Sequence, residues 1–130
     1  MIVKTFKPQF SPLVERCTKN QTCRQWPTRR DGTVDQRLLP KPGRALSLRQ
    51  WTGRPYASVQ RVLRDTVATR LAAVRVSDEG IVVQGRTLPP AEREAFSRRD
   101  GFRSFAELRR WFSGECWSGY CVEWPKEQTK

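Results

Sequence analysis

Apolar and polar residues alternate along several short segments of the chain, and this period of two is typical of half-buried β-strands. Between residues 58 and 76 a helical spacing of apolar residues competes with β-branched valines, and the valines favour strands. The turn-like sequence Ser77-Asp78-Glu79-Gly80 then predicts a hairpin with the apolar run that follows. Strands are predicted at 2–6, 20–26, 44–51, 81–83 and 117–124, and the region 58–76 is predicted to consist of strands throughout.

Start and stop signals predict three helices. A first short helix is expected at about 12–17, because Ser11 stands as N-cap before a proline. A second is expected over about 88–99, between a proline pair and an Asp-Gly step. A third follows Ser104, which forms a capping box with Glu107. The apolar face of this third helix consists of Phe105, Leu108, Trp111 and Phe112.

The order of these elements predicts an α+β fold in one domain over residues 1–130, compatible with a small mixed barrel that carries helices at its ends. The periodic pattern breaks at 27–43, where Arg29-Arg30-Asp31-Gly32 and Pro40-Lys41-Pro42-Gly43 are turn-like. We interpret 27–43 as a long basic loop, and loops of this length in small domains are usually functional or disordered.

The charge balance points to an anionic partner. The chain has 25 Lys and Arg against 13 Asp and Glu, a net charge of +12. Such a field attracts nucleic acid, an anionic membrane surface or an acidic protein. Most of the excess positive charge is arginine, which pairs with phosphate and stacks on bases, so nucleic acid is the favoured partner. The alternative is that the charge serves solubility. Without an apolar run typical of a signal peptide or a membrane span, we expect a cytoplasmic protein with no membrane partner.

The four cysteines do not form a metal-binding motif. Five residues separate Cys17 from Cys23, four separate Cys116 from Cys121, and the chain has no histidine. Zinc sites typically leave two to four residues between paired cysteines, so the first gap is too long and the second is at the limit. We therefore expect no metal and buried or partly buried free thiols, with a Cys116–Cys121 disulfide on storage in air as an alternative. Histidine-dependent catalysis is excluded, no phosphate-binding loop motif occurs, and no cofactor is expected.

The stretch CTKNQTCR, from Cys17 to Arg24, lies at the end of the first predicted helix and the start of the next strand. It resembles the signature of the ASCH domain family, a member of the PUA-like superfamily. That signature is approximately Gly-x-Lys-x-x-Glu-x-Arg, with a common variant Gly-Arg-Lys-Thr-x-Thr-Ile-Arg. Lys19, Thr22 and Arg24 match the variant, whereas Cys17 replaces the glycine and Asn20 the first threonine.

Three further segments extend the resemblance over most of the chain. Residues 6–10 precede the first helix as in relatives, 41–48 resemble the family's Pro-Gly-Asp turn and the strand after it, and 100–108 resemble an acidic–Gly–Phe segment before the last helix. The resemblance implies a PUA-like mixed β-barrel with flanking helices.

The resemblance also implies nucleic-acid handling, chiefly of RNA. Some members resemble small amidohydrolases that deacylate modified cytidine, and others are described as cleaving RNA. In the amidohydrolase type a lysine, a threonine and an acid cooperate. By position these would be Lys19, Thr22 and Asp100, although relatives with that activity carry glutamate in place of the aspartate.

Two roles for Lys19 follow from elementary chemistry. A threonine hydroxyl is a poor nucleophile and needs a base, and Lys19 serves as one only if burial and the charges of Arg16 and Arg24 lower its pKa. Otherwise Lys19 and Arg24 stay charged and hold phosphate, while Thr22 donates a hydrogen bond. We rank phosphate binding first.

We therefore expect an RNA-binding domain with a basic cleft. Trp26 or Trp51 would stack on a base, with core packing as the alternative for either one. The alternatives to RNA binding are a hydrolase acting on RNA or on a modified nucleoside, and a protein-interaction module, such as a viral protein, that uses its basic surface against an acidic partner. The side chains expected to contact phosphate are Arg16, Lys19, Arg24, Arg29 and Arg30.

Overall fold

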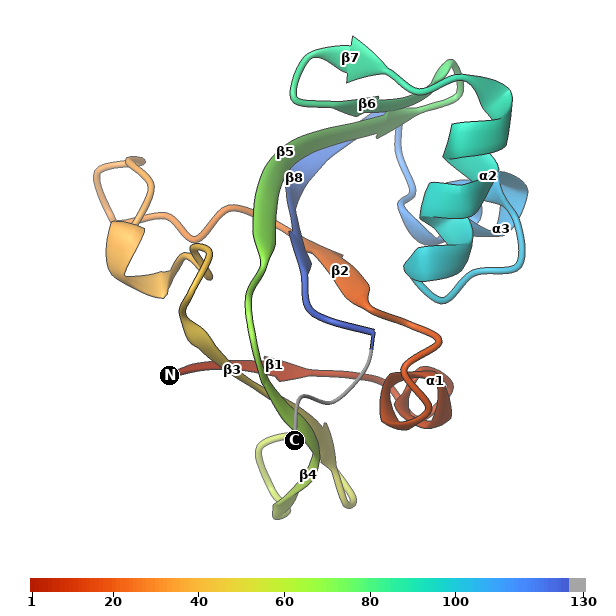
Figure 1. Cartoon of the computed structure of the whole chain (residues 1–130). Coiled ribbons are helices and arrows are strands. Elements are labelled where there is room, and N and C mark those ends of the chain that lie inside the picture. The colour runs from red at the N-terminus through yellow and green to blue at the C-terminus, as the bar shows by residue number, and fades with distance from the viewer. Residues whose placement is uncertain (127–130) are drawn as a thin grey trace.

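The computed structural model describes residues 1–126 as two β-sheets and three short α-helices, which confirms the α+β class (Figure 1). The smaller sheet has the order β1-β3-β4, with β1 parallel to β3 and β3 antiparallel to β4. The larger sheet has the order β2-β8-β5-β6-β7, and its neighbouring strands are antiparallel. Strand pairing within residues 1–126 does not join the two sheets into one closed barrel.

All the predicted strands form. Three successive residues of β3 are buried, whereas burial alternates in β5. There Ala72, Val74 and Val76 are buried while Arg75 between the two valines is exposed. The predicted hairpin is formed by β5 and β6, and the two-residue strand β7 was not predicted. The bounds are β1 (Ile2–Thr5), β2 (Gln21–Arg24), β3 (Ala45–Trp51), β4 (Gln60–Val67), β5 (Arg70–Ser77), β6 (Gly80–Val83), β7 (Arg86–Thr87) and β8 (Cys116–Glu123).

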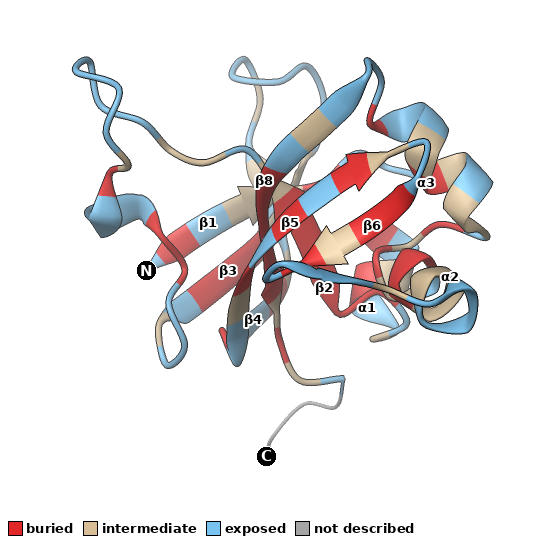
Figure 2. Cartoon of the chain, turned by 90° about the horizontal axis from the view of Figure 1, so that it is seen from above, coloured by how far each residue is buried: buried red, intermediate tan, exposed pale blue. Residues whose placement is uncertain are grey.

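The core lies between the two sheets and beneath the helices. Figure 2 shows buried positions along β1, β3, β5 and β8. The largest fully buried apolar side chains are Trp124, Tyr120, Leu46, Leu48, Ile81 and Leu108. Aromatic residues supply much of the buried area, as expected for a small, highly charged chain.

The helices are α1 (Ser11–Glu15), α2 (Pro90–Arg99) and α3 (Phe105–Trp111). Helix α3 begins as its capping box predicts, because the Ser104 side chain accepts a hydrogen bond of 3.3 Å from the Glu107 amide. Figure 1 shows α2 and α3 together beside the larger sheet, with α1 beside the smaller one. None of the helices within residues 1–126 is long and apolar enough to cross a membrane.

Helix α1 differs from its prediction at both ends. Phe10 rather than Ser11 is the N-cap, and no side-chain hydrogen bond caps this end. The helix stops at Glu15 because Cys17 has a φ of 61°, a left-handed conformation that an α-helix cannot contain. The amides of Thr18 and Lys19 then donate to the Leu13 carbonyl and turn the chain towards β2.

The predicted loop at 27–43 is tied to the rest of the fold by local contacts. It contains one isolated bridge, between Thr28 and Val34, and one turn of 3₁₀-helix at Gln36–Leu38. Buried Asp35 caps that turn by accepting from the Arg37 amide at 3.1 Å. Arg44 donates to the carbonyls of Arg37 and Leu39, which holds the end of the loop against the start of β3.

The left-handed turn at Cys17 generates a stability prediction. A residue with a Cβ atom is strained in this conformation and glycine is not, so Cys17→Gly should raise the free energy of unfolding by roughly 0.5–1 kcal/mol. Cys116→Gly is the matched control, and it should lower that free energy by a similar amount because glycine weakens strand β8. Denaturant unfolding of the three proteins measures both effects. A Cys17→Gly variant no more stable than the starting protein would contradict the assignment of strain.

Candidate functional site

A cleft of about 490 Å³ opens between the end of β1, strand β2, the end of β3 and the segment around α3. Five of the residues singled out in the sequence line it: Lys19, Thr22, Arg24, Trp51 and Asp100. The other lining residues are Thr5, Phe6, Lys7, Pro8, Phe10, Cys23, Gln50, Gly53, Pro55, Tyr56, Phe102, Trp111 and Phe112.

Lys19 and Asp100 form a buried ion pair at the base of the cleft. Each residue is only 2% exposed, and Lys19 Nζ lies 3.8 Å from Asp100 Oδ1. Lys19 Nζ also donates a hydrogen bond to the backbone carbonyl of Asp100. The Lys19 ammonium lies 5.0 Å from the ring centroid of Phe10, which places the charge among aromatic carbons as well as beside a carboxylate.

Gly101 makes room for this lysine. Its φ of 96° favours glycine, and a Cβ atom there would lie 3.1 Å from Lys19 Cδ and 3.0 Å from the Phe10 ring. The Asp-Gly step at the end of α2 therefore ends the helix and also allows the lysine side chain to pass beneath it.

Asp100 has further polar partners that hold its orientation. Its Oδ1 accepts from Gln21 Nε2 at 3.3 Å and from the Cys23 thiol at 3.6 Å. Burial raises the pKa of Asp100, while Lys19, Gln21 and Cys23 oppose that rise. Burial likewise lowers the pKa of Lys19, opposed mainly by Asp100. Desolvation thus drives both groups towards their neutral forms, and their mutual attraction favours the charged pair.

Arg24 connects the threonine of the motif to strand β1. Its Nε donates to Thr22 Oγ1 at 3.2 Å, and its Nη2 donates to the Thr5 carbonyl at 2.6 Å. Thr22 and Arg24 alternate with Cys23 along β2, so their side chains share one face of the strand. Burial lowers the pKa of Arg24. Position 119 on β8, next to Arg24, must be glycine, because a Cβ atom there would lie 2.2 Å from the Arg24 carbonyl oxygen.

Lys4 lies behind Arg24 and was not singled out by its sequence context. Its ammonium donates a hydrogen bond to the Tyr120 hydroxyl and lies 5.0 Å from that ring. Burial, followed by the nearby charge of Arg24, lowers the pKa of Lys4 to about 8. Desolvation raises the pKa of Tyr120 to about 12. The polar cluster around Arg24 therefore extends beyond the lining of the cleft to Lys4 and Tyr120.

Aromatic rings form the walls of the cleft. Phe10, Phe102 and Trp111 contact one another with centroid separations of 5.2–5.8 Å. Trp51 and Tyr56 form a second pair at 5.1 Å, and Tyr56 is 92% exposed. The Lys7 ammonium lies 4.9 Å from the Trp111 ring. Apart from Trp51, these side chains were missed as site residues. Trp111 was assigned to the apolar, core-packing face of the third helix, and the others carried no recognisable signal in the sequence.

The remaining candidates lie outside the lining of the cleft. Arg16 is exposed and donates to the Pro12 carbonyl within α1. Arg29 and Arg30 are exposed on the long loop, which both views place on the other side of the molecule from α1 (Figures 1 and 2). Trp26 packs on Tyr120 at a centroid distance of 5.4 Å. The structure therefore separates the loop arginines from the cleft.

The cysteines remain free thiols, and the alternative Cys116–Cys121 disulfide is wrong. Both residues belong to strand β8, where a separation of five positions corresponds to roughly 17 Å, well beyond disulfide reach. Cys23 and Cys121 instead face each other across β2 and β8, and their sulfur atoms lie within 4.8 Å of each other and of an Asp100 oxygen. This group offers three donors, fewer than the four of a structural zinc site, and Lys19 already places a cation beside Asp100. The absence of a metal site stays a prediction.

Comparison of the chain with protein-family models, with curated proteins and with solved structures gave no match.

Proposed function

We propose that this chain is an RNA-binding domain whose cleft receives one base of a single-stranded segment. The observation that carries the proposal is the combination of aromatic walls with the buried polar cluster of Lys19, Arg24 and Asp100 at the base. Bases bind proteins by stacking on aromatic rings while their edges hydrogen-bond to polar groups. A cleft of about 490 Å³ is in the size range of sites that hold small organic groups.

The rim of the cleft supplies the stacking surface in this proposal. Trp51 and Tyr56 stand at the end of β3 and in the loop after it, and Tyr56 holds a left-handed φ of 62°. Strained exposed aromatic residues are uncommon outside functional sites. A base resting on Trp51 would place its polar edge towards Lys19, Arg24 and Asp100.

Phosphate contacts would come from the cations at the mouth rather than from Lys19. The sequence favoured phosphate binding as the role of Lys19, but Lys19 is buried and already paired with Asp100. In this proposal Lys7 and Arg54 bind phosphate instead. Lys7 lines the cleft, and Arg54 is exposed in the loop between Trp51 and Tyr56. Arg16, Arg29 and Arg30 would contact RNA that extends beyond the cleft, and the net charge of +12 favours its approach.

The proposal includes an ASCH-like domain in a PUA-like barrel. Two observations support it. The left-handed residue Cys17 stands where the family signature has glycine, which tolerates that conformation. Asp100 lies far from Lys19 and Thr22 in the sequence, yet all three line the same cleft.

Trp51→Ala tests the stacking role. It should weaken binding of a short single-stranded RNA roughly tenfold, because each stacked base contributes about 1–3 kcal/mol. Fluorescence anisotropy across a salt series measures the affinity, and its logarithm should fall linearly with the logarithm of salt concentration. Trp26→Ala is the matched control and should retain the affinity, because Trp26 lies outside the cleft. Equal affinities of Trp51→Ala and the unmodified protein would exclude base stacking in this cleft.

Hydrolysis of a modified nucleoside or of RNA is a second candidate function. The specific observation in its favour is that burial lowers the pKa of Lys19, which brings this amine closer to acting as a base. Arg24 donates to Thr22 Oγ1, so a developing negative charge on that oxygen would be stabilised. In this proposal Thr22 Oγ1 attacks the acyl carbon or the phosphorus while Lys19 takes the hydroxyl proton and Asp100 positions the lysine. Lys19 then returns that proton to the leaving group, the cytidine amine or a ribose oxygen, as its bond breaks, and water hydrolyses the resulting threonine ester.

Thr22→Val separates hydrolysis from binding. It removes the hydroxyl with little change of shape, so it should lower the release of acetate from acetylated cytidine, or the cleavage of RNA, at least about a hundredfold. Binding of RNA should persist in this variant. Thr18→Val is the control, since Thr18 is exposed and lies outside the cleft. Undiminished turnover in Thr22→Val would refute the assignment of Thr22 as nucleophile.

Lys19→Arg tests the role of the base. This variant should also be inactive, because arginine cannot release its proton.

A further inference from the structure

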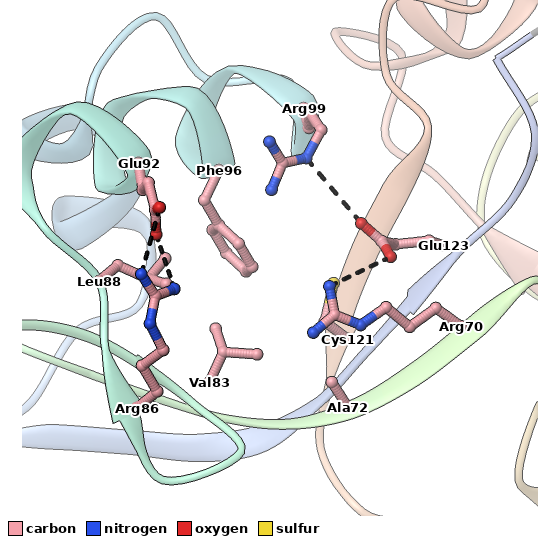
Figure 3. Close-up of a pocket in the computed structure, with 10 residues that line it drawn as sticks. All are labelled: Arg70, Ala72, Val83, Arg86, Leu88, Glu92, Phe96, Arg99, Cys121 and Glu123. Carbon is pink, nitrogen blue, oxygen red and sulfur yellow. Dashed lines mark hydrogen bonds and ion pairs between the residues drawn. The ribbon is translucent and has the colours of Figure 1, made fainter.

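A second pocket, of about 240 Å³, lies between helix α2 and the face of the larger sheet (Figure 3). Its floor is apolar and consists of Ala72, Val83, Leu88, Phe96 and Cys121. These residues come from β5, β6, α2 and β8 and from the segment before α2, so the pocket is built by elements that the fold holds together. Its volume corresponds to the liquid volume of about eight water molecules.

The two ends of this pocket differ in their charge pairing, as Figure 3 shows. At one end Arg86 donates two hydrogen bonds to the Glu92 carboxylate, at 2.7 and 3.2 Å, and this pair is complete. At the other end Arg70 and Arg99 share the single carboxylate of Glu123, at 3.8 and 3.9 Å. Among residues 1–126, two guanidinium charges therefore share one carboxylate at that end.

The guanidinium groups of Arg70 and Arg99 retain donors that no other residue of the described part of the chain uses. Within residues 1–126 the Arg70 side chain makes no hydrogen bond, and the Arg99 side chain makes one, from Nε to Gln21 Oε1 at 3.3 Å. Neither arginine is close enough to Glu123 for a hydrogen bond. A guanidinium group with free N–H donors beside an apolar surface is suited to bind the oxygens of a carboxylate or a phosphate.

We propose that this pocket is a second ligand site, and that it binds a small molecule with an apolar body and one anionic oxygen group. The apolar body would lie on Ala72, Val83 and Phe96, and the anion would bridge Arg70 and Arg99. Glu123 remains as the shared counter-ion, so the occupied end carries two cations and two anions. This inference does not rest on the function proposed for the cleft.

The arginine at this end also connects the pocket to the cleft. Arg99 donates to Gln21 Oε1, and fully buried Gln21 donates through Nε2 to Asp100 Oδ1 at 3.3 Å. Asp100 in turn pairs with Lys19. A ligand that draws Arg99 away from Gln21 would therefore act on a side chain that orients Asp100.

Phenylacetate and phenyl phosphate are suitable probes, because both join an aromatic ring to one anionic group. We expect either probe to produce saturable shifts in the NMR signals of the Ala72 and Val83 methyl groups of the full chain. Neutral phenylacetamide has nearly the same shape as phenylacetate and should bind at least about tenfold more weakly. Preference for one probe would identify the headgroup as carboxylate or phosphate, and either preference supports the site.

Arg70→Gln tests the anion contact directly. Arg70 is largely exposed, so the variant should fold, and it should bind the preferred probe about tenfold more weakly. Arg103→Gln is the matched control, because the Arg103 side chain is 93% exposed and pairs with Glu107 outside this pocket. The proposal is overturned if neither anion shifts the two methyl signals. It is equally overturned if phenylacetamide binds as well as phenylacetate, or if Arg70→Gln binds as well as Arg103→Gln.

Discussion

The buried ion pair between Lys19 and Asp100 is the constraint on which the site depends. Taking both charges out of water costs several kcal/mol per ion, and the cost is offset only by good geometry and further hydrogen bonds. Gln21 and Cys23 provide such contacts to Asp100, while the Asp100 carbonyl accepts from Lys19. Gly101 is needed to admit the lysine stem. The pair thereby ties the chain before β2 to the end of α2.

This tie explains how a small fold forms a deep polar site between aromatic walls. Asp100 ends α2, and the short segment after it leads into α3, which contributes Trp111 to the lining of the cleft. Phe10, the N-cap of α1, contacts Phe102 and Trp111 and lies beneath the Lys19 ammonium. Asp100 and Gln21 also link the cleft to the second pocket beneath α2, so neighbouring polar groups serve both concave surfaces.

The sequence allowed prediction of the elements more fully than of the site. Alternating apolar residues and a capping box act locally, so the strands β3 and β5 and the start of α3 could be predicted from neighbouring residues. The stop of α1 could not, because a cysteine rather than a glycine holds the left-handed turn. The family resemblance pointed to Lys19, Thr22 and Asp100, but it did not reveal that Lys19 is fully buried. Burial and aromatic surroundings depend on contacts between Phe10, Phe102 and Trp111, which no local pattern encodes.

The central claim is that the Lys19–Asp100 pair exists for binding rather than for stability, and the double variant Lys19→Met with Asp100→Leu tests it most directly. Replacing a buried ion pair by apolar side chains of similar size is often neutral or stabilising, so the free energy of unfolding should stay within about 2 kcal/mol of the original. RNA affinity, measured on the same folded protein, should fall at least about tenfold because the polar floor of the cleft is lost. A folded double variant that binds RNA as tightly as the original chain would contradict the account.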